Sequence, residues 1–125
     1  MLRRTRAGLL SVSLLPLGLG FAMQPEEPKV QDGPPSYTRQ VAPIFQSRCS
    51  ECHGAETKEA GLDLSTYESV MKGSEYGTVV EAGDVDASLL IEMVTAGEMP
   101  QDADPLPAEE IEILRAWIAA GATNN

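Results

Sequence analysis

The chain has 125 residues, of which 42% are hydrophobic and only 5% aromatic, so it supports one small domain and disfavours a self-sufficient β-sandwich. Its nine basic and 19 acidic residues give a formal charge of −10, which makes nucleic acid and anionic lipid surfaces poor partners. The surplus of carboxylates suits a partner protein with a basic surface, and it suits simple solubility equally well.

The first 22 residues have the pattern of an export signal. Arg3, Arg4 and Arg6 precede an apolar run over residues 9–22 that ends in small residues. The run is short for a membrane span, and Pro16 weakens it further, so we predict a signal peptide, with an uncleaved membrane anchor as the alternative. The predicted location is periplasmic or otherwise extracytoplasmic. Loss of the three arginines leaves six basic residues and a formal charge of −13.

Residues 23–36 contain four prolines and several charges but almost nothing apolar. This composition predicts an acidic, proline-rich linker or loose tail. We therefore place a single folded domain at residues 37–125. Its first helix is expected over 37–48, where Val41, Ile44 and Phe45 are spaced for one face, with a late start or a kink at Pro43.

The most specific motif follows this helix directly and consists of Cys49, Cys52 and His53. Two thiols separated by two residues and followed at once by a histidine are typical of covalent attachment of a c-type haem. On a helical turn, positions 49 and 52 share one face, so both sulfurs can reach the two vinyl groups of one porphyrin edge. His53 is then placed to bind the iron axially, and a second ligand would complete the octahedron.

Three other uses of the same residues compete with haem attachment. A structural zinc site needs four ligands, and the chain has only these two cysteines and one histidine. A thioredoxin-like pair needs a βαβ context, which the surrounding sequence does not indicate. A plain disulfide between the two thiols stays open, particularly before haem is attached.

Short helices and loops are expected in the middle of the chain. Gly54 is expected to supply a left-handed turn, and Leu62 and Leu64 to face inward from a loop. Ser65 and Glu68 have the spacing of a capping box for a helix ending at Lys72. The glycine-rich stretch 73–84 predicts an extended loop over the haem edge.

Two further helices are predicted. Asp86 is expected to cap a helix over 87–95, whose apolar face would hold Leu89, Leu90, Met93 and Val94. Pro107 marks the start of the last helix, which Gly121 closes. Its apolar positions are Ile111, Leu114, Trp117 and Ile118. The fold class is therefore all-α, with three to four short helices around one covalently attached haem.

The second axial ligand cannot be another histidine of this chain, so a methionine sulfur, an exogenous ligand or a vacant position remains. The candidates after the signal are Met23, Met71, Met93 and Met99. Met99 is preferred because it lies in a loop, directly before Pro100, and a loop can aim a sulfur at the iron more easily than a helix face can. Met93 is the next candidate.

With these features in place, the chain resembles the monohaem class I cytochromes c, and most closely the planctomycete-type cytochrome c domain. The resemblance implies crossing first and last helices, Cys49 and Cys52 as thioether donors, and His53 and Met99 as the axial pair. The chain departs from these domains after Met99, where a single proline is followed by Gln101. The stretches that match are 41–54, 60–66, 83–94, 97–100 and 109–122.

The leading functional hypothesis is a one-electron carrier that is not an enzyme and exchanges electrons with redox partner proteins in an extracytoplasmic chain. The alternative is a small haem peroxidase, or a gas- or redox-sensing module with a labile sixth ligand. No distal histidine or arginine arranged for peroxide cleavage is indicated by the sequence. A membrane association is expected only if the N-terminal segment is retained.

Overall fold

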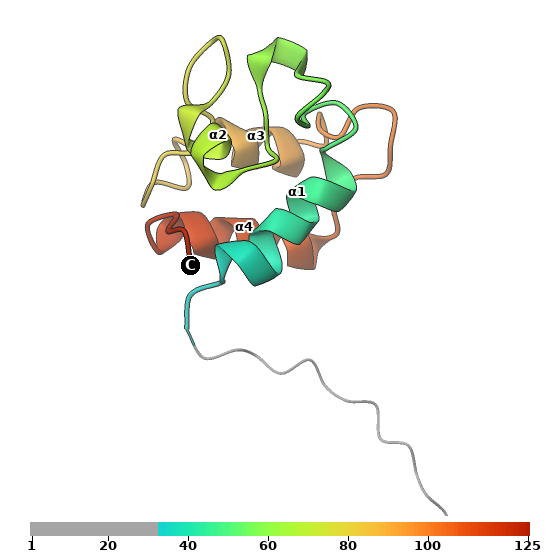
Figure 1. Cartoon of the computed structure of the whole chain (residues 1–125). Coiled ribbons are helices and arrows are strands. Elements are labelled where there is room, and N and C mark those ends of the chain that lie inside the picture. Colours follow the sequence, from blue (N-terminus) through green and yellow to red (C-terminus); the bar gives the residue numbers. More distant parts are fainter. Residues whose placement is uncertain (1–32) are drawn as a thin grey trace, which may run out of the picture.

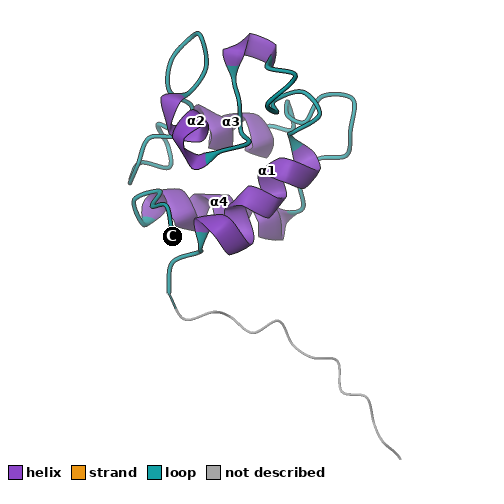
Figure 2. Ribbon diagram, in the orientation of Figure 1, coloured by secondary structure: helices purple, strands orange, loops and turns teal. Residues whose placement is uncertain are grey.

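A computed structural model describes residues 33–125, so the predicted signal over 1–22, the candidate Met23 and most of the linker lie outside the described residues. Four α-helices and two short helical turns of other types, joined by long loops, make up this part of the chain, and it contains no strand (Figures 1 and 2). The all-α prediction is confirmed. No helix in this part of the chain has the length and apolar character needed to span a bilayer.

The predicted helix over 37–48 forms in two parts. A π-helical turn, η1 (Tyr37–Val41), leads into α1 (Ala42–Arg48), with Pro43 in the first turn of α1, where a missing N–H costs nothing. Ser36 caps the segment, its hydroxyl accepting a hydrogen bond from the Arg39 N–H at 3.3 Å. The predicted break near Val41 and Pro43 is thus confirmed.

The last helix, α4 (Ala108–Ala119), begins after Pro107 and carries Glu109 and Glu110 in its first turn, where the helix dipole favours them. Leu114, Trp117 and Ile118 are buried, as their spacing predicts. Helix α1 crosses α4, and η1 packs against α4 (Figure 1). These elements bury most of the largest fully enclosed side chains: Val41, Phe45, Leu114, Trp117 and Ile118.

Two contacts hold the helix pair at its ends. The Arg48 guanidinium donates two hydrogen bonds to the Glu110 carboxylate, at 2.9 and 3.0 Å, and so ties the end of α1 to the start of α4. At the other end, Asn125 lies beside the start of η1. The Asn125 backbone oxygen accepts from the Ser36 hydroxyl at 2.8 Å and the Thr38 N–H at 3.1 Å, and its side-chain oxygen accepts from the Tyr37 N–H at 2.8 Å.

Helix α2 (Tyr67–Lys72) begins one residue later than predicted. The capping box exists, but it joins Thr66 and Ser69 where the sequence suggested Ser65 and Glu68. Ser65 is unavailable because its hydroxyl and its N–H both donate to the Asp63 carboxylate, at 2.5 and 2.9 Å. The next residue with a hydroxyl therefore takes the cap.

Helix α3 (Leu89–Thr95) is shorter than the predicted 87–95, and Asp86 does not cap it. The buried Ser88 occupies the cap position, but its hydroxyl faces the preceding loop, donating to the Asp84 carbonyl at 2.7 Å and accepting from the Glu81 N–H at 2.9 Å. Asp84 instead accepts a hydrogen bond from the Ala87 N–H at 3.1 Å, which makes residues 84–87 a turn. The loop over 73–88 is therefore longer than the sequence suggests.

Candidate haem site

The Cys49–His53 segment continues α1 by one turn. Cys49 caps the helix, and its carbonyl accepts hydrogen bonds from the Cys52 N–H at 3.2 Å and the His53 N–H at 2.8 Å. The turn puts both cysteines and the histidine on the wall of one cavity, as the motif predicts. The two thiols are free and are not joined in a disulfide.

Gly54 is needed for space and not for a left-handed turn, so the predicted role of this glycine is wrong. Its φ angle is not positive, but a Cβ at this position would lie only 2.4 Å from the Ser50 carbonyl oxygen. The Gly54 N–H donates to the Thr57 carbonyl at 2.8 Å. The backbone at Gly54 therefore packs directly against the Ser50 carbonyl, where only glycine leaves enough space.

The orientation of the His53 ring is fixed by a backbone acceptor. Its Nδ1 lies 3.1 Å from the Glu59 carbonyl oxygen, which can only accept, so Nδ1 carries the proton and Nε2 carries the free lone pair. A hydrogen bond of this kind is the usual support of a metal-binding imidazole. The Glu59 carbonyl was not predicted from the sequence, since a backbone atom leaves no residue-type signal.

Met99 reaches the same cavity from the loop that follows α3. The Met93 carbonyl accepts hydrogen bonds from the Glu98 N–H at 3.0 Å and the Met99 N–H at 3.2 Å, so this loop folds back against the end of the helix. Met93 and Met99 both line the cavity, whereas Met71 packs against the hydrophobic core and is absent from its lining. Two of the four candidate methionines are therefore placed at the site.

The cavity itself has a volume of about 260 Å³ and mainly apolar walls. This is far more room than the roughly 10–15 Å³ that one water needs on the same kind of measure. Leucines and valines from four separate segments form the walls, with α3 presenting its predicted apolar face to the cavity. They are Leu62, Leu64, Val79, Leu89, Leu90, Val94 and Leu106.

Both thiols hold their protons more tightly than free cysteine does. Burial raises the pKa of Cys49 to about 11, and the Glu110 carboxylate adds to the effect. Desolvation and the carboxylates of Glu59 and Glu51 also raise the pKa of Cys52. A redox-active dithiol of the thioredoxin type needs a lowered thiol pKa, so the environment here argues against that use.

Two thiols, one oriented imidazole and two methionine thioethers around a large apolar cavity include every donor that haem c requires, in suitable surroundings. Within residues 33–125, no group of three or more His, Cys, Asp or Glu side chains is placed to hold a bare metal ion. The residues present therefore fit haem. Cys49 and Cys52 would hold it covalently, while His53 and Met99 would face the iron.

An all-α domain with a Cys-x-x-Cys-His turn opening onto an apolar cavity fits a c-type cytochrome. Comparison with protein-family models matches residues 49–102 to the family described as planctomycete cytochrome C, so this stretch is similar to a cytochrome c-type domain. The match starts at Cys49 and includes His53, Met93 and Met99. No curated protein and no solved structure matches the chain.

Proposed function

We propose that this protein is a one-electron carrier that holds a single haem c with His53 and Met99 as axial ligands. The observation that carries the proposal is the meeting of Cys49, Cys52, His53 and Met99 on one apolar cavity, although they come from two separate segments. Bound haem would supply one-electron chemistry by cycling between ferrous and ferric iron.

The residues of the chain would tune that chemistry. The Glu59 carbonyl fixes the His53 ring and raises its basicity through Nδ1. A Met99 sulfur would favour the ferrous form, and the leucine and valine walls exclude water and raise the potential further. With a protein ligand on each side, no substrate could reach the metal, which favours a carrier over an enzyme.

The test is a pair of methionine variants in the holo-protein. Met99→Ala should abolish the near-infrared sulfur-to-iron absorption band of the ferric form and lower the reduction potential, because a π-accepting thioether stabilises ferrous iron. Met93→Leu is the matched control, since both methionines line the cavity. It should keep the band and cost less than about 1.5 kcal/mol of stability.

If Met93→Leu removes the band and Met99→Ala keeps it, the ligand comes from α3. If the unaltered protein lacks the band and binds small exogenous ligands readily, the sixth position is labile. The peroxidase or sensor alternative then replaces the carrier.

We also propose that the partner carries a basic docking surface. The described residues include 16 acidic and five basic side chains, and two of the basic ones near the cavity, Arg48 and Lys58, are already paired with Glu110 and Asp63. Glu51 and Glu59 lie exposed on the cavity lining beside Tyr76 and Leu89, the two exposed large hydrophobic residues of this part of the chain. An apolar centre with an acidic surround suits a complementary cationic surface.

Small redox probes of opposite charge test this surface. At low ionic strength, a cationic cobalt(III) phenanthroline complex should oxidise the ferrous protein faster as salt is removed, whereas anionic ferricyanide should become slower. Neutralising Glu51 and Glu59 together should weaken both salt dependences, and neutralising Glu109 on α4 should change them less. Equal salt dependence for the two probes would contradict the proposal.

The export of the protein is proposed on the sequence of residues 1–22 alone. Haem c is attached outside the cytoplasm, so a chain beginning at Met23 without another signal should accumulate as apoprotein. Recovery of holo-protein from the cytoplasm would contradict extracytoplasmic maturation. Fractionation of the full chain would separate a free periplasmic protein from a membrane-tethered one.

A further inference from the structure

We propose that the ion pair between Lys58 and Asp63 is a positioning device for His53, because it holds the turn that presents the Glu59 carbonyl to the imidazole. This inference rests on the proposed function, in which His53 binds the haem iron. Its consequence is that two charged loop residues, neither of which would bind the haem iron, set the strength of the axial ligand.

The loop after the haem motif is anchored at its two ends by the motif itself. The Glu59 N–H donates to the Cys52 carbonyl at 3.0 Å, and the Leu64 N–H donates to the His53 carbonyl at 2.8 Å. His53 and Lys58 form an isolated antiparallel bridge. The acceptor for Nδ1 lies between these anchors, at the start of the 3₁₀ turn η2 (Glu59–Gly61).

This turn contains a backbone conformation that needs external support. Ala60 has φ 56° and ψ 23°, in the left-handed region that a residue with a Cβ rarely adopts, and Gly61 follows with φ 68°. Such residues persist where surrounding contacts over-determine them. One contact is the Glu75 N–H, which donates to the Ala60 carbonyl at 2.9 Å.

The other support is an ion pair between Lys58, which precedes the turn, and Asp63, which follows it. Lys58 Nζ lies 2.9 Å from Asp63 Oδ2, so the residues that precede and follow η2 are joined. The Asp63 carboxylate is held in place. Its second oxygen accepts hydrogen bonds from both the N–H and the hydroxyl of Ser65, and its side chain is only 14% exposed. These Ser65 bonds and Lys58 lower the pKa of Asp63 to about 2, so the carboxylate stays charged.

Loss of the Lys58–Asp63 ion pair should weaken the hydrogen bond between the Glu59 carbonyl and Nδ1 of His53. An imidazole that donates a weaker hydrogen bond is less basic and stabilises ferric iron less well. The reduction potential should then become more positive. A simple charge effect must be separated from this one, because any change of charge near the haem also moves the potential.

The double variant Lys58→Met/Asp63→Asn makes this separation, since it removes one charge of each sign. We expect a more positive potential and faster exchange of the His53 Nδ1 proton by NMR. The Glu59 and Leu64 amides should also lose protection in hydrogen exchange. Lys58→Arg keeps the pair and should retain all three properties.

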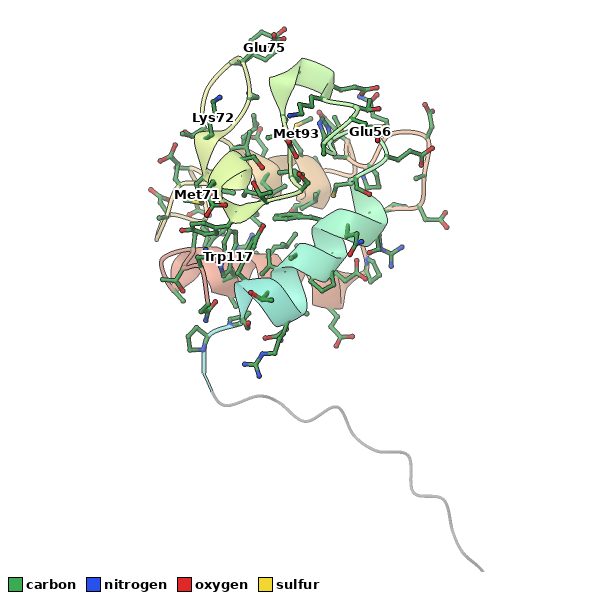
Figure 3. The ribbon with its side chains drawn as sticks, in the orientation of Figure 1. Glu56, Met71, Lys72, Glu75, Met93 and Trp117 are labelled. Carbon is green, nitrogen blue, oxygen red and sulfur yellow. The ribbon has the colours of Figure 1, made fainter. Side chains whose placement is uncertain are left out.

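Glu56→Gln is the matched control because Glu56 is exposed on the same loop (Figure 3). None of the ion pairs found within residues 33–125 involves its carboxylate. It should leave the Nδ1 proton and the amides unchanged. A double variant with unaltered potential and unaltered Nδ1 exchange would overturn the inference. Failure of the unaltered protein to bind haem or to show a reversible couple would instead overturn the proposed function.

Discussion

The two halves of this domain differ in what fills their interiors. In the helical half, formed by η1, α1 and α4, protein side chains fill the interior, and Phe45 and Trp117 are each only 1% exposed. In the cavity half, formed by α3 and the long loops, leucines and valines line a space of about 260 Å³ that no side chain fills. The interior of the first half is therefore completed by protein side chains alone, whereas the second half leaves an apolar space that fits the proposed haem.

The largest effect should come from denying the domain its cofactor. Cys49→Ala/Cys52→Ala removes both attachment points, so the apolar walls of the cavity would face water. We expect amides of α3 and residues 53–64 to lose more than about tenfold in hydrogen-exchange protection, while α1 and α4 retain most of theirs. Cavity-half amides as protected as those of the holo-protein would show that its walls support themselves.

Truncation of the helical core should affect both halves together. Trp117 packs against Tyr37 with ring centroids 5.6 Å apart, and its indole N–H donates to the Thr123 carbonyl at 2.9 Å. Trp117→Ala should lower the free energy of unfolding of the holo-protein by about 3–5 kcal/mol, measured by chemical denaturation. The control Ala116→Ser, on the exposed side of α4, should stay within about 0.5 kcal/mol. A loss below about 1 kcal/mol for Trp117→Ala would contradict the comparison.

The smallest effect should be an acid-dependent loss in the cavity half. The pKa of Asp63 falls from its ordinary value of 3.8 to about 2 in the folded protein, mainly through the Ser65 hydrogen bonds. Its stabilising contribution is therefore complete above pH 3.8 and is lost as the pH falls through about 2. Because Lys58 is half-exposed, we expect at most about 1 kcal/mol. Asp63→Asn should flatten this acid limb of the stability curve and Glu56→Gln should not.

Periodicity and motif spacing predicted the all-α class, the kink near Pro43 and the last helix, because these depend on local sequence. Helix caps were less predictable. Ser65 and Asp86 are residue types that commonly cap helices. The Ser65 hydroxyl, however, donates to the Asp63 carboxylate. Before α3, the Asp84 carboxylate accepts the Ala87 N–H and forms a turn there. The choice among neighbouring polar residues depends on which of them a tertiary contact has already occupied.

The candidate site shows the same limit. The Cys49, Cys52 and His53 positions follow from the motif, and their shared cavity with Met99 agrees with the predicted roles, which remain predictions. The carbonyl of Glu59 has no signature because it belongs to the backbone. Lys58 and Asp63 read as ordinary surface charges until the fold brings them to the two sides of one turn.

The junction of Asn125 with Ser36, Tyr37 and Thr38 has a mechanical consequence. Tension applied between residues 36 and 125 falls first on these few hydrogen bonds, then on the packing of η1 against α4 (Figure 1) and on the Arg48–Glu110 ion pair. The haem motif and the cavity loops lie within the length of chain that this junction closes. They carry no load until the helices separate, so the cavity half is shielded from a pull on the ends of the domain.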